Sequence, residues 1–223
     1  MERRLPKSLR EQLAESVYPG VLLRVDMTRR KQLVLEIQET RTRLPVYSWT
    51  AGQRELTPFL MALYWLLPLG RYPKRGYEWV VIEEPEMGLH PRAIVGVIQA
   101  LLHLLHRGYR VVLTTHSITV VEWVWLVQRL KSVPWESGQE ALSEYLGIPR
   151  VPARLTEIAA EGLKKEIRTY YFRRRGTEVT AVDISSLDAW DENPDVAEWG
   201  GLATTTERAH RVLAQALSAR SSG

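Results

Sequence analysis

The sequence has 223 residues, of which 45% are hydrophobic and 25% charged, with a formal net charge of +4 and a pI near 9.4. This length and composition suit a globular protein with one large domain, with or without an appendage. The chain contains no cysteine, which excludes disulfides, thiolate metal sites and a thiol nucleophile and makes a cytoplasmic location the default expectation. Neither a run of about eighteen apolar residues nor the apolar core of a secretory signal is present, so we expect no membrane association.

The first part of the chain combines helical and β-rich patterns. Residues 8–17 predict a short helix that ends at the sequence YPG, and three alternating runs at 21–27, 32–39 and 44–49 predict an antiparallel β region. The apolar stretch 55–70 predicts a helix, in which we expect Pro58 to be tolerated only in the first turn.

The middle of the chain has a strand–helix–strand pattern. Residues 78–84 and 109–117 read as buried strands, and residues 91–108 between them read as a helix with Pro91 suited to its start and Gly108 to its end. Continuous apolar strands separated by a helix predict a parallel sheet covered on both faces, and therefore an α/β fold class.

The remainder predicts mostly helices. The expected elements are helices at 121–130, 137–148 and 154–167, a hairpin at 168–185 that turns near Gly176, and a last helix at 204–220. We divide the chain into an N-terminal helix and antiparallel β region (1–48), a core (49–130), and C-terminal helices with a hairpin (131–223).

The most unusual stretch is WVVIEEPEMGLHPRA, in which an apolar strand leads directly into Glu83 and Glu84. Ligands bind at the carboxyl ends of strands in open parallel sheets, and successive side chains on a strand point in different directions. One carboxylate can therefore serve a magnesium ion while the other faces a reacting water as general base. For an isolated Glu-Glu pair, two solvated charges at a strand end are the simpler interpretation.

Two further segments carry candidate chemistry. The second strand ends in LTTHS, so His116 falls near Glu84 if the two strands are close in the sheet, where it can hydrogen-bond a phosphate oxygen. Thr50 followed by Gln53 is a capping-box pattern, and Gly52 between them allows close approach to an anion at a helix N-terminus. Alone, each segment has a structural explanation, as a strand-end histidine and as a well-capped helix.

In this order, TAGQ-x-E, EEPE-x-x-LHP and THS resemble the ABC-type ATPase head, most closely the SMC/RecF/OLD-like group of AAA family ATPases. The resemblance covers about residues 20–185. It implies the parallel-sheet core of a P-loop NTPase, with an N-terminal antiparallel β region and a C-terminal α+β extension. It places Glu83 at the magnesium, Glu84 as the catalytic base and His116 as the switch histidine. It also implies a D-loop at Met87–His90 and a signature loop that contacts ATP on an opposing head, formed by Thr50, Ala51, Gly52, Gln53 and Glu55.

One part of such a head is missing from the sequence. Nothing matches G-x-x-x-x-G-K-[ST], and no glycine is followed by lysine. The resemblance therefore implies the C-terminal half of a head, which would use ATP and Mg²⁺ in a composite site with a phosphate loop from a partner chain or a missing segment. It also implies a homo- or heterodimer of heads, and hydrolysis is expected only with such a partner.

Other functions remain open at this stage. The chain could be a remnant that is inactive as an ATPase, or a scaffold that reuses the fold. Glu83, Glu84, Glu86 and His90 could instead form a carboxylate–histidine metal site, as in a nuclease. Heads of this group commonly act on DNA, and basic candidates for such contact, each also explained as a solvated hairpin tip, are Arg29, Arg30, Lys31, Arg41, Arg43, Arg173, Arg174 and Arg175.

Overall fold

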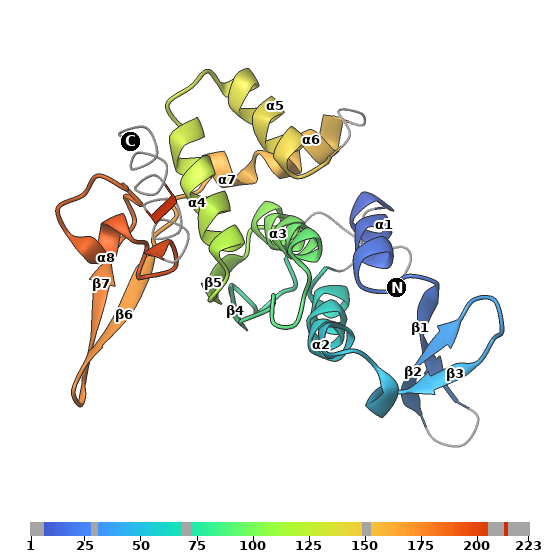
Figure 1. Cartoon of the computed structure of the whole chain (residues 1–223). Coiled ribbons are helices and arrows are strands. Elements are labelled where there is room, and N and C mark those ends of the chain that lie inside the picture. The colour runs from blue at the N-terminus through green and yellow to red at the C-terminus, as the bar shows by residue number, and fades with distance from the viewer. Residues whose placement is uncertain (1–6, 28–30, 68–72, 149–152, 205–211, 214–223) are drawn as a thin grey trace, which may run out of the picture. The chain divides into compact units, whose positions relative to one another are not determined.

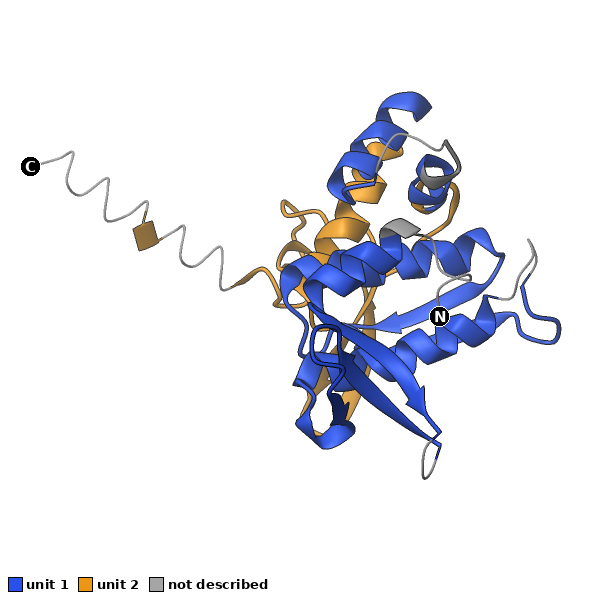
Figure 2. Ribbon diagram, turned by 90° about the vertical axis from the view of Figure 1, so that its right-hand side faces the viewer, with its two compact units in different colours: residues 1–115, 134–161 blue, residues 116–133, 162–223 orange. Residues whose placement is uncertain are grey.

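The computed structural model describes residues 7–27, 31–67, 73–148, 153–204 and 212–213 (Figure 1). The chain divides into two compact units, coloured separately in Figure 2. Unit 1 comprises Met1–Thr115 and Pro134–Glu161, and unit 2 comprises His116–Val133 and Gly162–Gly223. Most of the helix expected at 204–220 lies outside the described residues. No helix in the described ranges is both long enough and apolar enough to cross a membrane.

Unit 1 contains the helices and strands expected for the N-terminal and middle parts of the chain. Its helices are α1 (Lys7–Ser16), α2 (Ala51–Leu66), α3 (Pro91–His106), α5 (Trp135–Tyr145) and α6 (Ala153–Ala159). Its strands are β1 (Val21–Asp26), β2 (Gln32–Ile37), β3 (Arg43–Pro45), β4 (Trp79–Glu83) and β5 (Arg110–Thr114), and Val46–Ser48 forms the short 3₁₀ helix η1.

The first three strands form an antiparallel sheet in the order β1-β2-β3, as the alternating runs predict. The third strand is shorter than expected, because only Arg43–Pro45 pairs with β2 and the chain then turns into η1. Pro45 has no N–H to donate to a ladder, which explains why the pairing ends there.

Strands β4 and β5 form a parallel pair, in register from Trp79 opposite Arg110 to Glu83 opposite Thr114, and α3 connects them. This confirms the strand–helix–strand prediction. Alternate side chains of both strands pack against the core of unit 1, and these are Val80, Ile82, Val111 and Leu113.

The opposite face of the parallel pair is exposed. Trp79, Val81 and Val112 on this face are 56%, 66% and 43% exposed. The expectation of a sheet covered on both faces is therefore wrong for the described part of the chain. Among the residues that the structure describes, the elements that normally cover a parallel sheet are present on one face only.

The core of unit 1 lies where α1, α2 and α3 meet the strands (Figure 1). Leu13 on α1 packs directly over Gly96 on α3, where an added Cβ would lie 2.9 Å from a Leu13 methyl carbon. Leu56 and Leu63 on α2 and Leu104 on α3 are fully buried. Burial of each such leucine contributes about 1.5–3 kcal/mol, so this core fixes α2 and α3 against the sheet.

Helix α2 begins at Ala51, before the expected start at Glu55, because a complete capping box forms there. The Gln53 N–H donates to Thr50 Oγ1 (3.3 Å), and the Thr50 N–H donates to Gln53 Oε1 (3.1 Å). Pro58 consequently lies in the interior of the helix, and the expectation that it needs the first turn is wrong. Its ring is on the exposed side, where water can serve the carbonyl group that loses its partner.

Unit 2 contains α4 (Ile118–Leu130), most of α7 (Glu161–Lys164), the hairpin β6 (Tyr170–Arg175) and β7 (Glu178–Asp183), and α8 (Pro194–Ala197). The hairpin turns at Gly176, which has a φ of 59°, as expected from the sequence. The helix expected at 154–167 is divided into α6 and α7. Within unit 2, Trp123 and Val127 of α4 pack against Gly162.

Candidate active site

Glu83 and Glu84 lie at the carboxyl end of the parallel pair, as the sequence predicts. Glu83 is the last residue of β4, is exposed and lies opposite Thr114 of β5. Glu84 is half-buried, and its backbone leaves the strand with a φ of 41°. Its N–H donates to Thr114 O (3.0 Å), and Thr114 Oγ1 also lies within 3.3 Å of that nitrogen.

The positive φ at Glu84 is unusual for a residue with a side chain. Such a conformation costs an L-residue about 1–2 kcal/mol, because Cβ crowds the following carbonyl oxygen. Strained backbone of this kind persists only where its surroundings hold it, and it is concentrated at functional sites. Arg41, Leu187 and Trp199 also have a positive φ, so the strain alone does not single out Glu84. What distinguishes Glu84 is that its strained backbone lies at the carboxyl end of the parallel pair, where ligands bind in such sheets.

The turn that follows Glu84 is held by its own backbone and by β5. The Met87 N–H donates to Glu84 O (3.0 Å), and the Leu89 N–H donates to Glu86 O (3.0 Å). The Glu86 side chain is buried, with 8% exposure, and accepts a hydrogen bond of 2.5 Å from Thr115 Oγ1. The turn from Glu84 to Leu89 is thus an ordered element with a fixed relation to the end of β5.

The N-terminus of α2 lies directly against this turn. A Cβ added to Gly52 would lie 2.7 Å from Gly88 O, and a Cβ added to Gly88 would lie 3.1 Å from Gly52 N. Gly88 has a φ of 69°, which favours glycine. The predicted signature segment and the predicted D-loop are therefore in direct backbone contact, which sequence reasoning missed although both glycines signal close approach.

The residues of the signature segment differ in exposure. Thr50, Ala51 and Glu55 are exposed, Gly52 is buried and Gln53 is half-buried. Their role in binding a nucleotide remains a prediction.

The first turn of α2 is also tied to the end of α1. Gln53 Nε2 donates to Val17 O (3.1 Å), and Tyr18 Oη lies 3.0 Å from Thr57 Oγ1 and 3.4 Å from Gln53 O. Burial raises the pKa of the Tyr18 hydroxyl above its ordinary value, and the hydrogen bond with Thr57 acts in the opposite direction. These contacts fix the direction in which the helix N-terminus points.

His116, the predicted switch histidine, is the first residue of unit 2. It follows Thr115 directly, two residues beyond the end of β5, and it is exposed. Its role beside Glu84 remains a prediction.

The donor set at the end of β4 fits a magnesium site. Mg²⁺ takes oxygen ligands, usually one or two carboxylates with waters and phosphate oxygens, and Glu83 offers an exposed carboxylate at this edge. The four-residue nuclease-like metal site is not formed, because no group of three His, Cys, Asp or Glu in the described ranges could hold a metal ion. His90 instead caps α3, its Nδ1 accepting the Arg92 N–H (3.2 Å).

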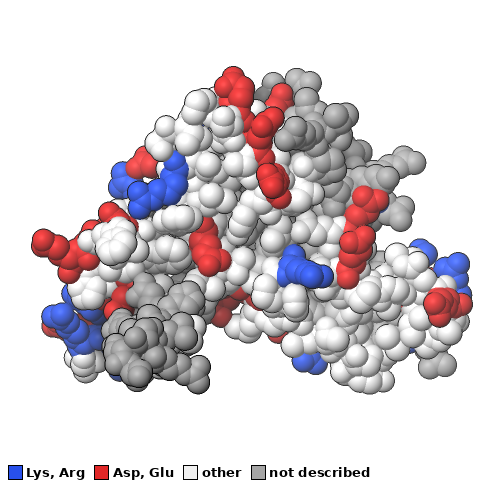
Figure 3. Space-filling view, turned by 45° about the horizontal axis from the view of Figure 1, so that its top comes forward, with Lys and Arg blue, Asp and Glu red and all other residues white. Residues whose placement is uncertain are grey.

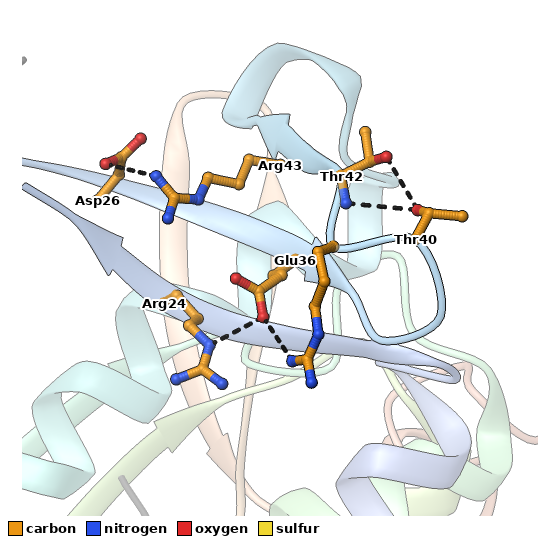
Figure 4. Close-up of polar contacts among 7 residues, drawn as sticks. Arg24, Asp26, Glu36, Thr40, Thr42 and Arg43 are labelled. Carbon is orange, nitrogen blue, oxygen red and sulfur yellow. Dashed lines mark hydrogen bonds and ion pairs between the residues drawn. The ribbon is translucent and has the colours of Figure 1, made fainter. Parts of the chain in front are cut away.

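Several of the basic residues that we considered for nucleic-acid contact form ion pairs. Arg41 contacts Glu36 at 3.2 Å and Arg43 contacts Asp26 at 2.9 Å (Figure 4). Arg24, which was not among these candidates, also contacts Glu36, at 3.3 Å. In unit 2, Arg173 contacts Asp195 at 2.6 Å. Arg29 and Arg30 lie outside the described residues.

Comparison with known proteins identifies a family. No curated protein and no solved structure matches the chain. One family model, described as "AAA domain, putative AbiEii toxin, Type IV TA system", matches residues 1–122, which is more than half of the chain and includes both candidate segments of unit 1. The chain belongs to this AAA domain family of P-loop ATPases.

Proposed function

We propose that the chain contributes a catalytic carboxylate, a switch histidine and a signature loop to a composite site that hydrolyses ATP. AAA ATPase domains typically use ATP and Mg²⁺. The single observation that carries the proposal is Glu84, a half-buried carboxylate held with a φ of 41° at the carboxyl end of a parallel strand. The missing phosphate loop would come from another polypeptide or from a segment outside this sequence.

The chemistry that these residues support is in-line attack of water on the γ-phosphate. Glu84 would polarise the attacking water as general base, and His116 would hydrogen-bond the γ-phosphate. Glu83 would hold Mg²⁺ directly or through water. When bound, this ion would neutralise charge on the phosphates. The exposed start of α2 at Thr50 and Ala51 would face the phosphates of ATP held by an opposing head, because helix N-termini favour anions.

The exposed face of the β4–β5 pair supports the proposal that a further segment completes the sheet and carries the phosphate loop. Parallel sheets occur almost only with both faces covered, and isolated two-stranded sheets are marginally stable. Here Trp79, Val81 and Val112 are exposed on one face, and this apolar row continues into Glu83 and Thr114 at the site. A strand–loop–helix segment, from another polypeptide or from outside this sequence, would cover this face and place its phosphate loop at the same edge.

The signature loop adds a requirement for dimerisation. In the proposed arrangement it closes over ATP bound to a second head, so the working form is a homo- or heterodimer of heads. The close approach of Gly52 and Gly88 supports this arrangement, because it holds the exposed start of α2 beside the turn after β4. The two segments could then face the second head together.

The test is ATP hydrolysis with Mg²⁺ by the purified chain, alone and with a polypeptide that bears a phosphate loop. We expect no turnover by the chain alone. With the partner, Glu84→Gln should lower kcat by about 10²–10⁴-fold, the usual contribution of a general base. The exposed Glu136→Gln on α5 serves as the matched control and should keep full activity.

Two results would contradict the proposal. Turnover by the chain alone that Glu84→Gln removes would mean that the chain forms a complete site without a phosphate loop from elsewhere. Turnover with the partner that is insensitive to Glu84→Gln would remove Glu84 from the chemistry.

An inactive remnant or a scaffold is the alternative function. The exposed apolar face of the β4–β5 pair favours it equally, since such a face suits a protein partner whether or not ATP is hydrolysed. Stable binding of the phosphate-loop polypeptide without turnover, in wild type and variants alike, would decide for the scaffold.

The cellular process that we propose is DNA-linked work, in repair or phage defence. It rests on the resemblance to ATPase heads that act on DNA. The family description, which names a putative toxin of a type IV TA system, is compatible with the second of these processes.

A further inference from the structure

We infer that Thr115 is a positioning residue for the Glu84 carboxylate, and that it acts through Glu86. This inference rests on the proposed function for its catalytic meaning, but its structural part can be tested without ATP. The family resemblance assigns no role to Thr115 or Glu86, and this inference gives each of them one.

The first observation is the bond between the two side chains. Thr115 Oγ1 donates to Glu86 Oε1, and the Glu86 residue is only 8% exposed. A buried carboxylate is retained at little net cost only where donors replace the water that it loses. The Thr115 hydroxyl is therefore a required partner of Glu86, and replacement by an isosteric methyl group leaves one carboxylate oxygen without that donor.

The second observation is how the bond relates to Glu84. Thr114 and Thr115 are consecutive at the end of β5, and each holds a different part of the same turn. Thr114 O accepts the Glu84 N–H, and Thr115 holds the side chain two residues further on. Glu84 is thus attached to β5 through its own N–H, and the turn is attached again two residues later, through Glu86, to the residue that follows β5. These two attachments restrain the backbone on which the positive φ of Glu84 depends.

The third observation excludes a freely moving turn. The Leu89 N–H donates to Glu86 O, and Gly88 contacts the start of α2. Glu86 is therefore connected through its side chain to β5 and through its backbone to the part of the turn that touches α2. Loss of the Thr115 bond would release the turn on its β5 side, while α2 would still hold the other side.

The first test uses the chain alone and measures amide hydrogen exchange by ¹⁵N NMR. Thr115→Val should raise exchange of the Met87 and Leu89 amides by about tenfold, because both amides donate within the turn. Thr115→Ser, which keeps the hydroxyl, should leave them at the wild-type rate. Ser143→Ala removes another buried hydroxyl of unit 1 and should also leave them unchanged.

Three results of this test would overturn the inference. They are unchanged exchange in Thr115→Val, a rise in Thr115→Ser as large as in Thr115→Val, and an equal rise at the buried Leu101 amide of α3, which would indicate general loosening of the unit.

The second test uses the reconstituted site with the phosphate-loop polypeptide. Thr115→Val should lower kcat about tenfold with KM unchanged, since the proposed contacts with ATP come from Glu83, His116 and the start of α2 and not from Thr115 or Glu86. Thr115→Ser should restore kcat. Equal kcat in Thr115→Val and wild type would overturn the positioning role. If wild type itself shows no hydrolysis, the proposed function fails, while the exchange experiment still decides whether Thr115 holds the turn.

Discussion

The backbone of Glu84 is the most informative single position in the molecule. Its neighbour Glu83 ends a regular strand, whereas Glu84 takes a φ of 41° that disfavours any side chain. Glycine at this position would remove the crowding of Cβ. A side chain retained in such a conformation, at the carboxyl end of the parallel pair, fits a carboxylate whose proposed use outweighs its cost to folding.

Glycine substitution at the two glutamates should have opposite effects on stability. Glu84→Gly should raise the free energy of unfolding by about 0.5–1 kcal/mol, because relief of about 1–2 kcal/mol of strain exceeds the entropic cost of glycine. Glu83→Gly, in the regular strand β4, should lower it by about 0.5–1 kcal/mol. Urea denaturation followed by circular dichroism measures both.

Comparison of the two variants separates relief of strain at Glu84 from a general effect of glycine on stability. If both variants lose stability equally, the backbone at Glu84 is not strained, and the structural argument for its function fails. If Glu84→Gly gains stability and also loses hydrolysis in the reconstituted site, stability and function oppose each other at this residue.

The sequence was sufficient to predict the position of the two glutamates. An apolar run that ends in charges, followed by a helix and another apolar run, predicts carboxylates at the carboxyl edge of a parallel pair, and the structure confirms that edge. The positive φ of Glu84 and the hydrogen bond from Thr115 to Glu86 could not be predicted from the sequence. They depend on the register between β4 and β5, which a single sequence does not fix.

At the scale of elements, α2 and the turn after β4 form one structural piece. The capping box at Thr50 and Gln53 is a local pattern and was predicted from the sequence. The contact between Gly52 and Gly88 joins residues from separate elements, and only the packed structure reveals it. Local rules also failed at Pro58, where an exposed helix face tolerates an interior proline.

Alanine substitution at two helix glycines should separate this contact from ordinary packing. Gly52→Ala places a Cβ 2.7 Å from the Gly88 carbonyl oxygen, which belongs to the backbone and has little room to move. Gly96→Ala places a Cβ 2.9 Å from the end of the flexible Leu13 side chain. Gly52→Ala should therefore be the more destabilising change, by about 1–3 kcal/mol, as measured by chemical denaturation.

The effect of Gly52→Ala should also be visible in the turn after β4. In Gly52→Ala, NMR chemical shifts of the amides from Glu84 to Leu89 should change, whereas Gly96→Ala should leave them as in the wild type. Equal stability of the two variants, with unchanged shifts in the turn, would mean that α2 and the turn are not mechanically joined.

The net charge of the chain is positive. On the face drawn in Figure 3, basic and acidic side chains are interspersed over uncharged surface. Among the described residues, Arg41, Arg43 and Arg173 are engaged by Glu36, Asp26 and Asp195. These three guanidinium groups are therefore less available for contact with DNA phosphates than exposed, unpaired arginines would be.

DNA binding by the purified chain should accordingly be weak and should fall as salt rises, because it would rest on phosphate contacts. Arg43→Ala should change the affinity little, since Asp26 already offsets this charge, whereas Asp26→Asn should strengthen binding by releasing it. Fluorescence anisotropy with a short duplex measures both variants. Absence of binding at low salt would refute a direct DNA contact, and a large loss in Arg43→Ala would refute the offsetting role of Asp26.

The two units are interleaved along the chain, which passes between them at residues 115/116, 133/134 and 161/162. During synthesis, α4 therefore leaves the ribosome before the last helices of unit 1 and well before its own packing partner at Gly162. Translation of the intervening segment takes on the order of seconds, and for that time Trp123 and Val127 lack the contact that later covers them. We therefore expect the yield of folded protein to depend on how quickly residue 162 follows α4 out of the ribosome.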